Sequence, residues 1–134
     1  MTFFLARLHP QSGHLTYVNA GHNPPIVIGT AGLRRLSTGG TIVGAFPESV
    51  YEQETVALDP GDILVIFSDG VTEAFNEQWE EFGDDRLVAC VTANCERLSE
   101  EMLGRIVDTV KAFTGNAAAS DDMTVLVLRR SGRN

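Results

Sequence analysis

The chain has 134 residues, a length typical of one domain, and its 43% hydrophobic and 21% charged residues are an ordinary balance for a globular protein. The formal net charge of -8 argues against nucleic acid and anionic membrane surfaces as partners, because both attract basic proteins. No apolar run is long enough for membrane insertion or for a signal peptide, so the sequence indicates a cytoplasmic protein.

The first half of the chain has the pattern of short strands joined by turns. Alternating or apolar runs predict strands over residues 3–8, 14–18, 25–28, 33–36, 51–58 and 63–67. The last of these runs is apolar throughout, which indicates a strand covered on both faces. Residues 38–41 and 44–49 are predicted to be loops, and Pro60 with Gly61 suits a type II turn.

The second half is predicted to be mainly helical. One helix is expected over residues 84–95, and a second from an N-cap at Ser99 to a stop at Gly115. An apolar stripe on the second helix is predicted to face the core: Leu103, Ile106, Val107, Val110 and Phe113. A last strand is predicted over residues 123–128. Strands grouped early and helices grouped late indicate an α+β fold with a packed sheet core.

Two acidic motifs lie at the ends of apolar strands. Asp69 and Gly70 follow the strand over residues 63–67, whereas Asp121 and Asp122 precede the last strand. If these strands are antiparallel neighbours, the motifs converge, and converging carboxylates repel unless they share a proton or a cation. Oxygen ligands favour Mg²⁺ or Mn²⁺ over zinc. A metal site is one interpretation, and ordinary turn or cap aspartates are the alternative.

The loop that contains Asn19, Gly21 and His22 is the most distinctive turn in the chain. It is interpreted either as a structural loop, with the histidine hydrogen-bonded to the backbone, or as a loop that contacts a substrate. Glu73 is either half of a glycosidase-like carboxylate pair with Asp69 or a glutamate at a helix start. Ser68 has no base at a recognisable spacing, so no catalytic nucleophile is predicted.

Five segments in this order and spacing resemble a known family. They are residues 17–25 (YVNAGHNPP), 58–62 (LDPGD), 67–74 (FSDGVTEA), 82–83 (FG) and 121–124 (DDMT). Together they are similar to the bacterial SpoIIE-like branch of the metal-dependent type 2C (PPM) serine/threonine protein phosphatases. The resemblance implies two packed antiparallel β-sheets flanked by helices, with a pair of Mn²⁺ or Mg²⁺ ions at one end of the sandwich.

The resemblance also implies an activity and its residues. The expected reaction is hydrolysis of phosphoserine or phosphothreonine on a regulatory protein, in this branch a phosphorylated anti-sigma-factor antagonist in a partner-switching pathway. Asp69 and Asp121 match metal ligands of the family, Asp122 is a neighbouring metal-site residue, and Gly70 supplies backbone beside the metals. No catalytic side chain beyond the metal ligands is implied.

One departure from the family matters. The family's Gly-Asp motif and its Asp-x-x-Gly-His-Gly motif are absent from this sequence, and they supply other principal metal ligands. We therefore expect residues 1–134 to form a single truncated phosphatase-like domain that lacks the N-terminal part of the fold and is not a competent catalyst by itself. Uncovered apolar surface is then expected to drive homo-oligomer formation.

Two alternatives to the phosphatase remain open. One is a non-catalytic module that kept the fold and binds a phosphoprotein. The other is a sugar hydrolase or hydratase that uses Asp69 and Glu73 without a divalent cation.

Overall fold

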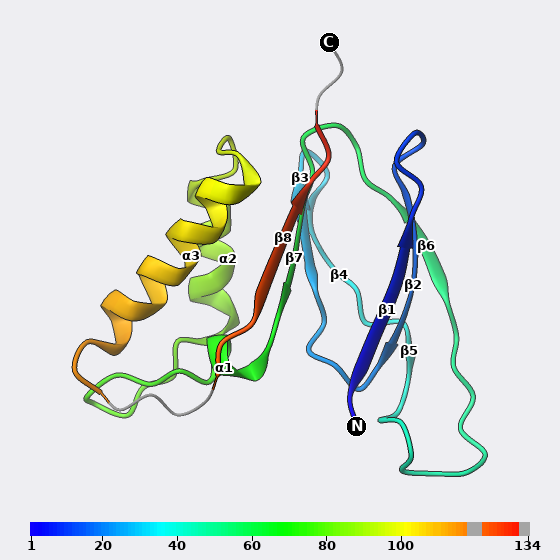
Figure 1. Ribbon diagram of the computed structural model, residues 1–134, viewed down its shortest axis with the longest axis horizontal. Helices are drawn as coiled ribbons and strands as arrows, with labels where there is room; N and C mark the ends of the chain where they lie inside the picture. Colours follow the sequence, from blue (N-terminus) through cyan, green and yellow to red (C-terminus); the bar gives the residue numbers. More distant parts are fainter. Residues whose placement is uncertain (118–121, 132–134) are drawn as a thin grey trace.

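The computed structural model describes residues 1–117 and 122–131, and they form three layers: two β-sheets and a pair of helices (Figure 1). The first sheet consists of β1 (Phe3–Leu8), β2 (His14–Ala20), β5 (Gly39–Gly40) and β6 (Glu54–Ala57). In it β2 is central, since it pairs antiparallel with β1 and β6 and parallel with β5. The two-residue strand β5 lies in a segment that the sequence pattern predicted as loop.

The second sheet lies between the first sheet and the helices. Its strands follow the order β4 (Gly32–Arg35), β3 (Ile26–Gly29), β7 (Ile63–Phe67) and β8 (Val125–Arg129), and every pair is antiparallel. Three helices follow β7 in the chain: α1 (Asp69–Thr72), α2 (Gly83–Ala93) and α3 (Ser99–Thr114). Figure 1 shows α2 and α3 against the face of this sheet that points away from the first. The predicted sandwich of two sheets flanked by helices is confirmed.

The central strand β7 is covered on both faces, as its apolar sequence predicted. Ile63, Val65 and Phe67 belong to the core between the second sheet and the helices, and Leu64 belongs to the core between the two sheets. On α3 the buried residues are Met102, Ile106 and Val110, each four residues apart. Leu103, predicted for the core, is 37% exposed. The buried stripe follows the i, i+4 row that starts at Met102, one residue before Leu103.

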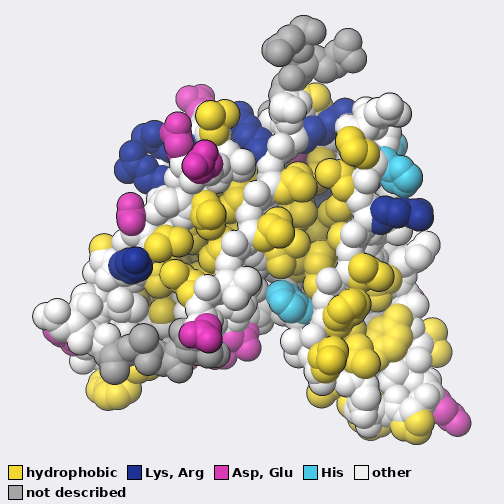
Figure 2. Space-filling model, viewed as in Figure 1, with side chains coloured by type: hydrophobic (Ala, Val, Ile, Leu, Met, Phe, Trp, Pro, Cys, Tyr) yellow, Lys and Arg dark blue, Asp and Glu magenta, His cyan; other side chains and the backbone are white. Residues whose placement is uncertain are grey.

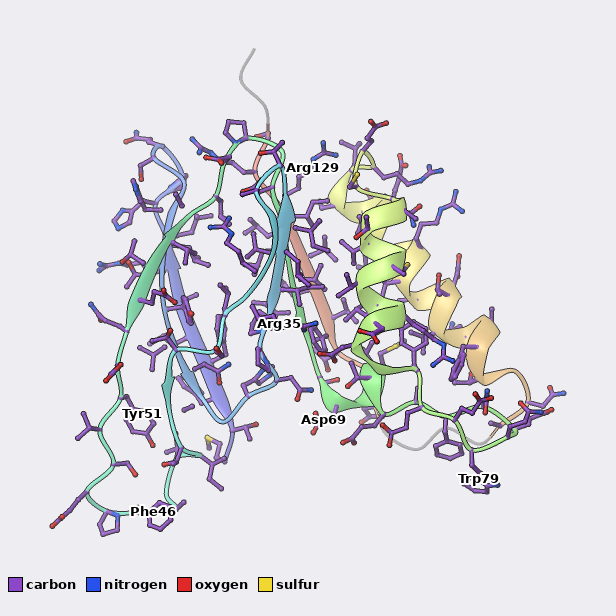
Figure 3. All side chains as sticks on the ribbon, turned by 180° about the vertical axis from the view of Figure 1, so that it is seen from behind. Arg35, Phe46, Tyr51, Asp69, Trp79 and Arg129 are labelled. Carbon is purple, nitrogen blue, oxygen red and sulfur yellow. The ribbon has the colours of Figure 1, made fainter. Side chains whose placement is uncertain are left out.

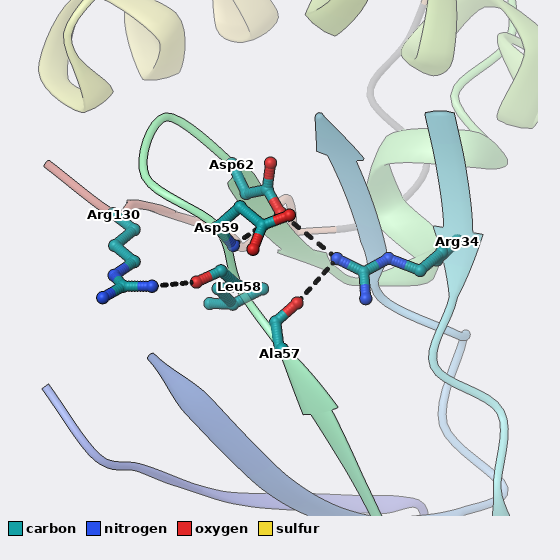
Figure 4. A network of polar contacts seen from close by, with 6 residues as sticks. All are labelled: Arg34, Ala57, Leu58, Asp59, Asp62 and Arg130. Atoms are coloured by element: carbon teal, nitrogen blue, oxygen red, sulfur yellow. Dashed lines mark hydrogen bonds and ion pairs between the residues drawn. The ribbon is translucent and has the colours of Figure 1, made fainter. Parts of the chain in front are cut away.

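A buried polar network closes the turn between β6 and β7 (Figure 4). The carboxylate of Asp62 is 2% exposed and accepts hydrogen bonds from the backbone N–H of Asp59, at 2.9 Å, and from the guanidinium of Arg34, at 3.2 Å. Arg34 also donates to the carbonyl of Ala57, and Arg130 donates to the carbonyl of Leu58. The network therefore ties β4, the turn and the end of β8 together.

Two of the edge strands in the described part of the chain, β1 and β8, have open edges on the same side of the molecule. There β1 pairs only with β2, and β8 pairs only with β7. Apolar side chains gather between these two edges (Figure 2). Leu126 of β8 is 50% exposed and Leu5 of β1 is 60% exposed. None of the helices in the described residues has the length and apolarity needed to cross a lipid bilayer.

Candidate functional site

The segments that carry Asp69 and Asp122 lie side by side because β7 and β8 are antiparallel neighbours. The last residue of β7, Phe67, is opposite the first residue of β8, Val125. Beyond this pair, the backbone N–H of Ser68 donates to the carbonyl of Thr124 at 3.0 Å, and the N–H of Thr124 donates to Oγ of Ser68 at 2.9 Å. The condition under which the motifs were expected to converge, that these strands are antiparallel neighbours, is met, although Asp121 lies outside the described residues.

Gly70 fixes how closely the two motifs approach. A Cβ atom at this position would lie 2.1 Å from the carbonyl oxygen of Asp122 and 3.2 Å from Cα of Met123. Such distances exclude any side chain, so glycine permits α1 to rest on the backbone that leads into β8. The close neighbour of Gly70 is thus the Asp122 peptide, and the predicted approach of its backbone to a metal stays a prediction. The side chain of Asp122 is exposed.

Asp69 is the first residue of α1, and its carboxylate is exposed (Figure 3). Its Oδ1 accepts a hydrogen bond from the side-chain amide of Asn23, which lies in the loop after β2. The sequence interpretation selected other residues of that loop and missed Asn23. The available signal was its place directly before Pro24, because a following proline disfavours helical backbone and holds the residue extended.

The loop after β2 is held from inside by Asn19. This side chain is 3% exposed, its amide donates to the carbonyl of Leu36, and its Oδ1 accepts from the backbone N–H of His22 at 2.8 Å. Nδ1 of His22 lies 2.8 Å from the carbonyl of Asn23. Gly21 adopts a φ of 73°, which favours glycine. These contacts give the loop the structural role that was its first interpretation, and they position Asn23 beside Asp69.

A polar pocket of about 190 Å³ lies where this loop meets the end of β7. It is lined by Thr2, Gly21, His22, Asn23, Ser68 and Asp69. The lining offers a carboxylate, amide, imidazole and hydroxyl groups, which suit a small polar ligand better than an apolar one.

A divalent metal requires several hard ligands that lie close together. Asp69 supplies the hard oxygen that Mg²⁺ and Mn²⁺ prefer. Within the described residues, however, no three His, Cys, Asp or Glu side chains lie close enough to hold a metal together. The described residues therefore do not complete a metal site by themselves. Glu73 stands at the end of α1, as its C-cap, and not at a helix start as one interpretation held.

Comparison with known proteins identifies the family. The model of the family "Stage II sporulation protein E (SpoIIE)" matches residues 1–131. Protein IcfG of Synechocystis is 33% identical over 135 residues, which are 97% of this chain and 20% of IcfG. The phosphoserine phosphatase RsbU of Bacillus subtilis is 30% identical over 132 residues, which are 97% of this chain and 39% of RsbU. The chain thus spans well under half the length of both relatives.

Solved structures share the fold. The PP2C phosphatase domain of SpoIIE from Bacillus subtilis, crystallised with a fragment of its regulatory domain, superposes with a TM-score of 0.77 at 22% identity, covering 96% of this chain and 37% of that one. A crystal of the same phosphatase domain presoaked with manganese gives a TM-score of 0.76 at 21% identity, covering 100% of this chain and 58% of that one. The motifs, the sandwich and the family match agree: the chain has the fold of PP2C phosphatase domains and belongs to the SpoIIE family.

Proposed function

We propose that this chain supplies one wall of the catalytic site of a metal-dependent phosphatase that hydrolyses phosphoserine or phosphothreonine on a regulatory protein. The observation that carries the proposal is the exposed carboxylate of Asp69, held at the end of buried β7 beside the segment that leads into β8. RsbU, a relative at 30% identity, is named a phosphoserine phosphatase, which supports the substrate class.

Asp69, Asp121 and Asp122 are the side chains proposed to face Mn²⁺ or Mg²⁺. A divalent cation in such a site supplies positive charge that stabilises the phosphoryl oxygens as the bond to the leaving group breaks. The chain's own contribution is orientation: Asn23 holds one oxygen of Asp69, and Gly70 keeps α1 against the Asp122 peptide. Pocket residues His22 and Ser68 can donate hydrogen bonds to a phosphate ester.

The first test is Mn²⁺ binding to the 134-residue chain by titration calorimetry, together with phosphate release from a phosphoserine peptide with and without a chelator. Because the described residues complete no metal site, we expect weak Mn²⁺ binding and little turnover from this chain alone. Asp69→Asn should remove the Mn²⁺ binding, whereas Asp59→Asn, a change at an exposed aspartate of a different turn, should not. Equal Mn²⁺ affinity in both variants would count against Asp69 as a ligand.

The incomplete set of metal donors also favours a second candidate, a module that binds a phosphoprotein without hydrolysing it. The partner in both cases is proposed to be a phosphorylated regulator of the anti-sigma-factor-antagonist type. The two functions differ in metal dependence: the module binds a phosphoserine peptide equally with chelator and with Mn²⁺, and it releases no phosphate under either condition.

A further inference from the structure

Two loops project on either side of the Asp69 pocket, at one end of the sandwich. They are residues 41–53, the first loop, between β5 and β6, and residues 73–82, the second loop, between α1 and α2. Figure 3 shows Phe46 and Tyr51 of the first loop on one side of Asp69 and Trp79 of the second loop on the other. The first loop presents several large apolar side chains to solvent and the second presents Trp79. Exposed apolar surface of this kind marks interaction sites when it gathers in a patch.

The first loop is joined directly to the pocket. Gly21, a pocket residue, lies against Ile42, where an added Cβ would be 2.3 Å from Cγ2 of the isoleucine. The backbone of Val43 exchanges hydrogen bonds with Met1 at 2.8 and 3.2 Å. Large apolar side chains of this loop are exposed by 37% to 81%: Ile42, Val43, Phe46, Val50 and Tyr51.

The second loop presents Trp79 in a strained conformation. Trp79 is 78% exposed and has a φ of 63°, the one positive φ at a residue other than glycine in the described chain. A bulky residue in this region of φ is an outlier, and such strain concentrates at functional sites. Asn76 stabilises the turn, because its Oδ1 accepts from the N–H groups of Gln78 and Glu80. The ring of Phe75 stacks on Trp79 at 4.9 Å between centroids.

All charged side chains of the two loops are negative. Residues 41–53 and 73–82 contain six glutamates and no lysine, arginine or histidine. Surfaces that associate place opposite charges across from each other, so a partner seated on these loops carries lysine or arginine. The same glutamates disfavour an anionic lipid surface.

We propose that the two loops form a docking surface for the phosphorylated protein, and that this protein carries apolar side chains and basic side chains on both sides of its phosphorylated residue. The inference rests on the proposed function, since it places the phosphoryl group in the Asp69 pocket. Phe46 and Trp79 lie on opposite sides of Asp69 (Figure 3), so a ligand that contacts both of them and the pocket extends beyond the pocket on two sides, as a protein segment does. Tryptophan is one of the residue types enriched among interface hot spots.

In the test, the 134-residue chain is the bait that selects peptides from a library. Each library peptide has a central phosphoserine and randomised flanking positions. A matched library has serine at the centre. The affinity of a selected, dye-labelled peptide is then measured by fluorescence anisotropy for wild type, Trp79→Ala, Phe46→Ala and Trp79→Phe. Trp79 is the only tryptophan in the sequence, so the intrinsic emission of the wild type reports on this loop alone.

We expect apolar and basic residues to be enriched in the selected flanks and the Trp79 emission to shift to shorter wavelength on binding. Trp79→Ala and Phe46→Ala should each weaken binding by about tenfold or more, as hot-spot truncations do, and Trp79→Phe should restore most of the affinity. Leu98→Ala is the matched control, because Leu98 is 67% exposed and directly precedes α3, at the other end of the sandwich. Circular dichroism checks that each variant is folded.

The proposal is overturned if no flanking residues are enriched, or if both alanine variants bind the selected peptide as wild type does. An emission shift with phosphatidylcholine vesicles but none with the peptides would also overturn it, in favour of a lipid surface. Failure of the proposed phosphatase is seen separately, in the Mn²⁺ titration of Asp69→Asn. Equal selection from the serine library would support the docking surface and contradict only phosphoryl recognition.

Discussion

Gly70 lies against the carbonyl oxygen of Asp122, and this contact joins the start of α1 to the segment that enters β8. The register of β7 on β8 brings the two motifs to the same edge, and the missing side chain at Gly70 lets their backbones touch. The geometry of the candidate site therefore depends on backbone packing at least as much as on its carboxylates. Substitutions that move this backbone should disturb the site without changing a charged residue.

Gly70→Ala should destabilise the protein by about 1–3 kcal/mol, the usual cost of forcing extra atoms into a packed position. The added Cβ would lie 2.1 Å from the Asp122 carbonyl, a backbone atom that cannot rotate away. Urea denaturation followed by circular dichroism measures the change. Gly104→Ala is the control: Gly104 lies within α3, an added Cβ there meets nothing within 4 Å, and alanine should raise stability by about 0.5–1 kcal/mol. Equal stability of Gly70→Ala and wild type would contradict the close contact.

Asp62→Asn should also lower the free energy of unfolding, by about 1.5–3 kcal/mol, the range for hydrogen bonds to charged groups. The buried carboxylate holds both Arg34 and the N–H of Asp59, and an amide cannot accept from both with the same strength (Figure 4). Asp59→Asn, at the exposed aspartate of the same turn, should change stability by about 0.5 kcal/mol or less. Comparing the two variants thus separates the contribution of the buried network to stability from that of the turn itself.

Much of the fold was predictable because apolar periodicity specifies strands that are buried on defined faces. The strands over residues 3–8 and 63–67 have the predicted bounds. The predicted strand over residues 51–58 is shorter in the structure, Glu54–Ala57, since its first residues belong to an exposed loop. The four-residue helix α1 was missed, because one helical turn has no periodicity to detect.

The candidate site was predictable only in part. Strand ends mark where side chains can converge, so Asp69 and Asp121 could be expected near each other before the register was known, and Asp121 lies outside the described residues. Asn23 could not be paired with Asp69 in the same way, because their contact depends on how the loop after β2 crosses from the first sheet to the second. The positive φ of Trp79 likewise arises from the Asn76 turn and leaves no mark in a hydrophobicity pattern.

A pH-dependent contribution to stability is expected from Glu54. Its carboxylate accepts hydrogen bonds from the hydroxyl groups of Tyr17, at 2.6 Å, and Thr38, at 2.8 Å, and these bonds lower the pKa of Glu54 below the ordinary 4.5. A lowered folded-state pKa contributes stability above pH 4.5 that is lost as the pH falls through the folded-state pKa. The stability difference between wild type and Glu54→Gln should therefore be constant near neutral pH and shrink in acid.

The same network makes a stabilising contribution with the opposite pH dependence in alkali. Burial, and then the bond to Glu54, raises the pKa of Tyr17 above 10.0, so this contribution is fully present below pH 10.0 and is lost as the pH rises through the folded-state pKa. Urea denaturation across the pH range measures both effects. In a Tyr17→Phe background the acid dependence of Glu54→Gln should be smaller, because the larger of the two hydrogen-bond contributions is gone. An unchanged acid dependence in that background would contradict the proposed cause.

Self-association is expected from the open edge of β1. This strand pairs only with β2 in the described residues, and Leu5 on it is 60% exposed, so its free backbone groups and apolar side chains can add a second copy of the chain. Light scattering coupled to chromatography should give a mass above 14.5 kDa that rises with concentration. Leu5→Lys should shift the mass toward the monomer, since a charge on an edge strand opposes pairing. Leu103→Lys, at an exposed position of α3, is the control and should associate as wild type does. A wild-type mass of 14.5 kDa at every concentration would show that this edge does not bind a second copy.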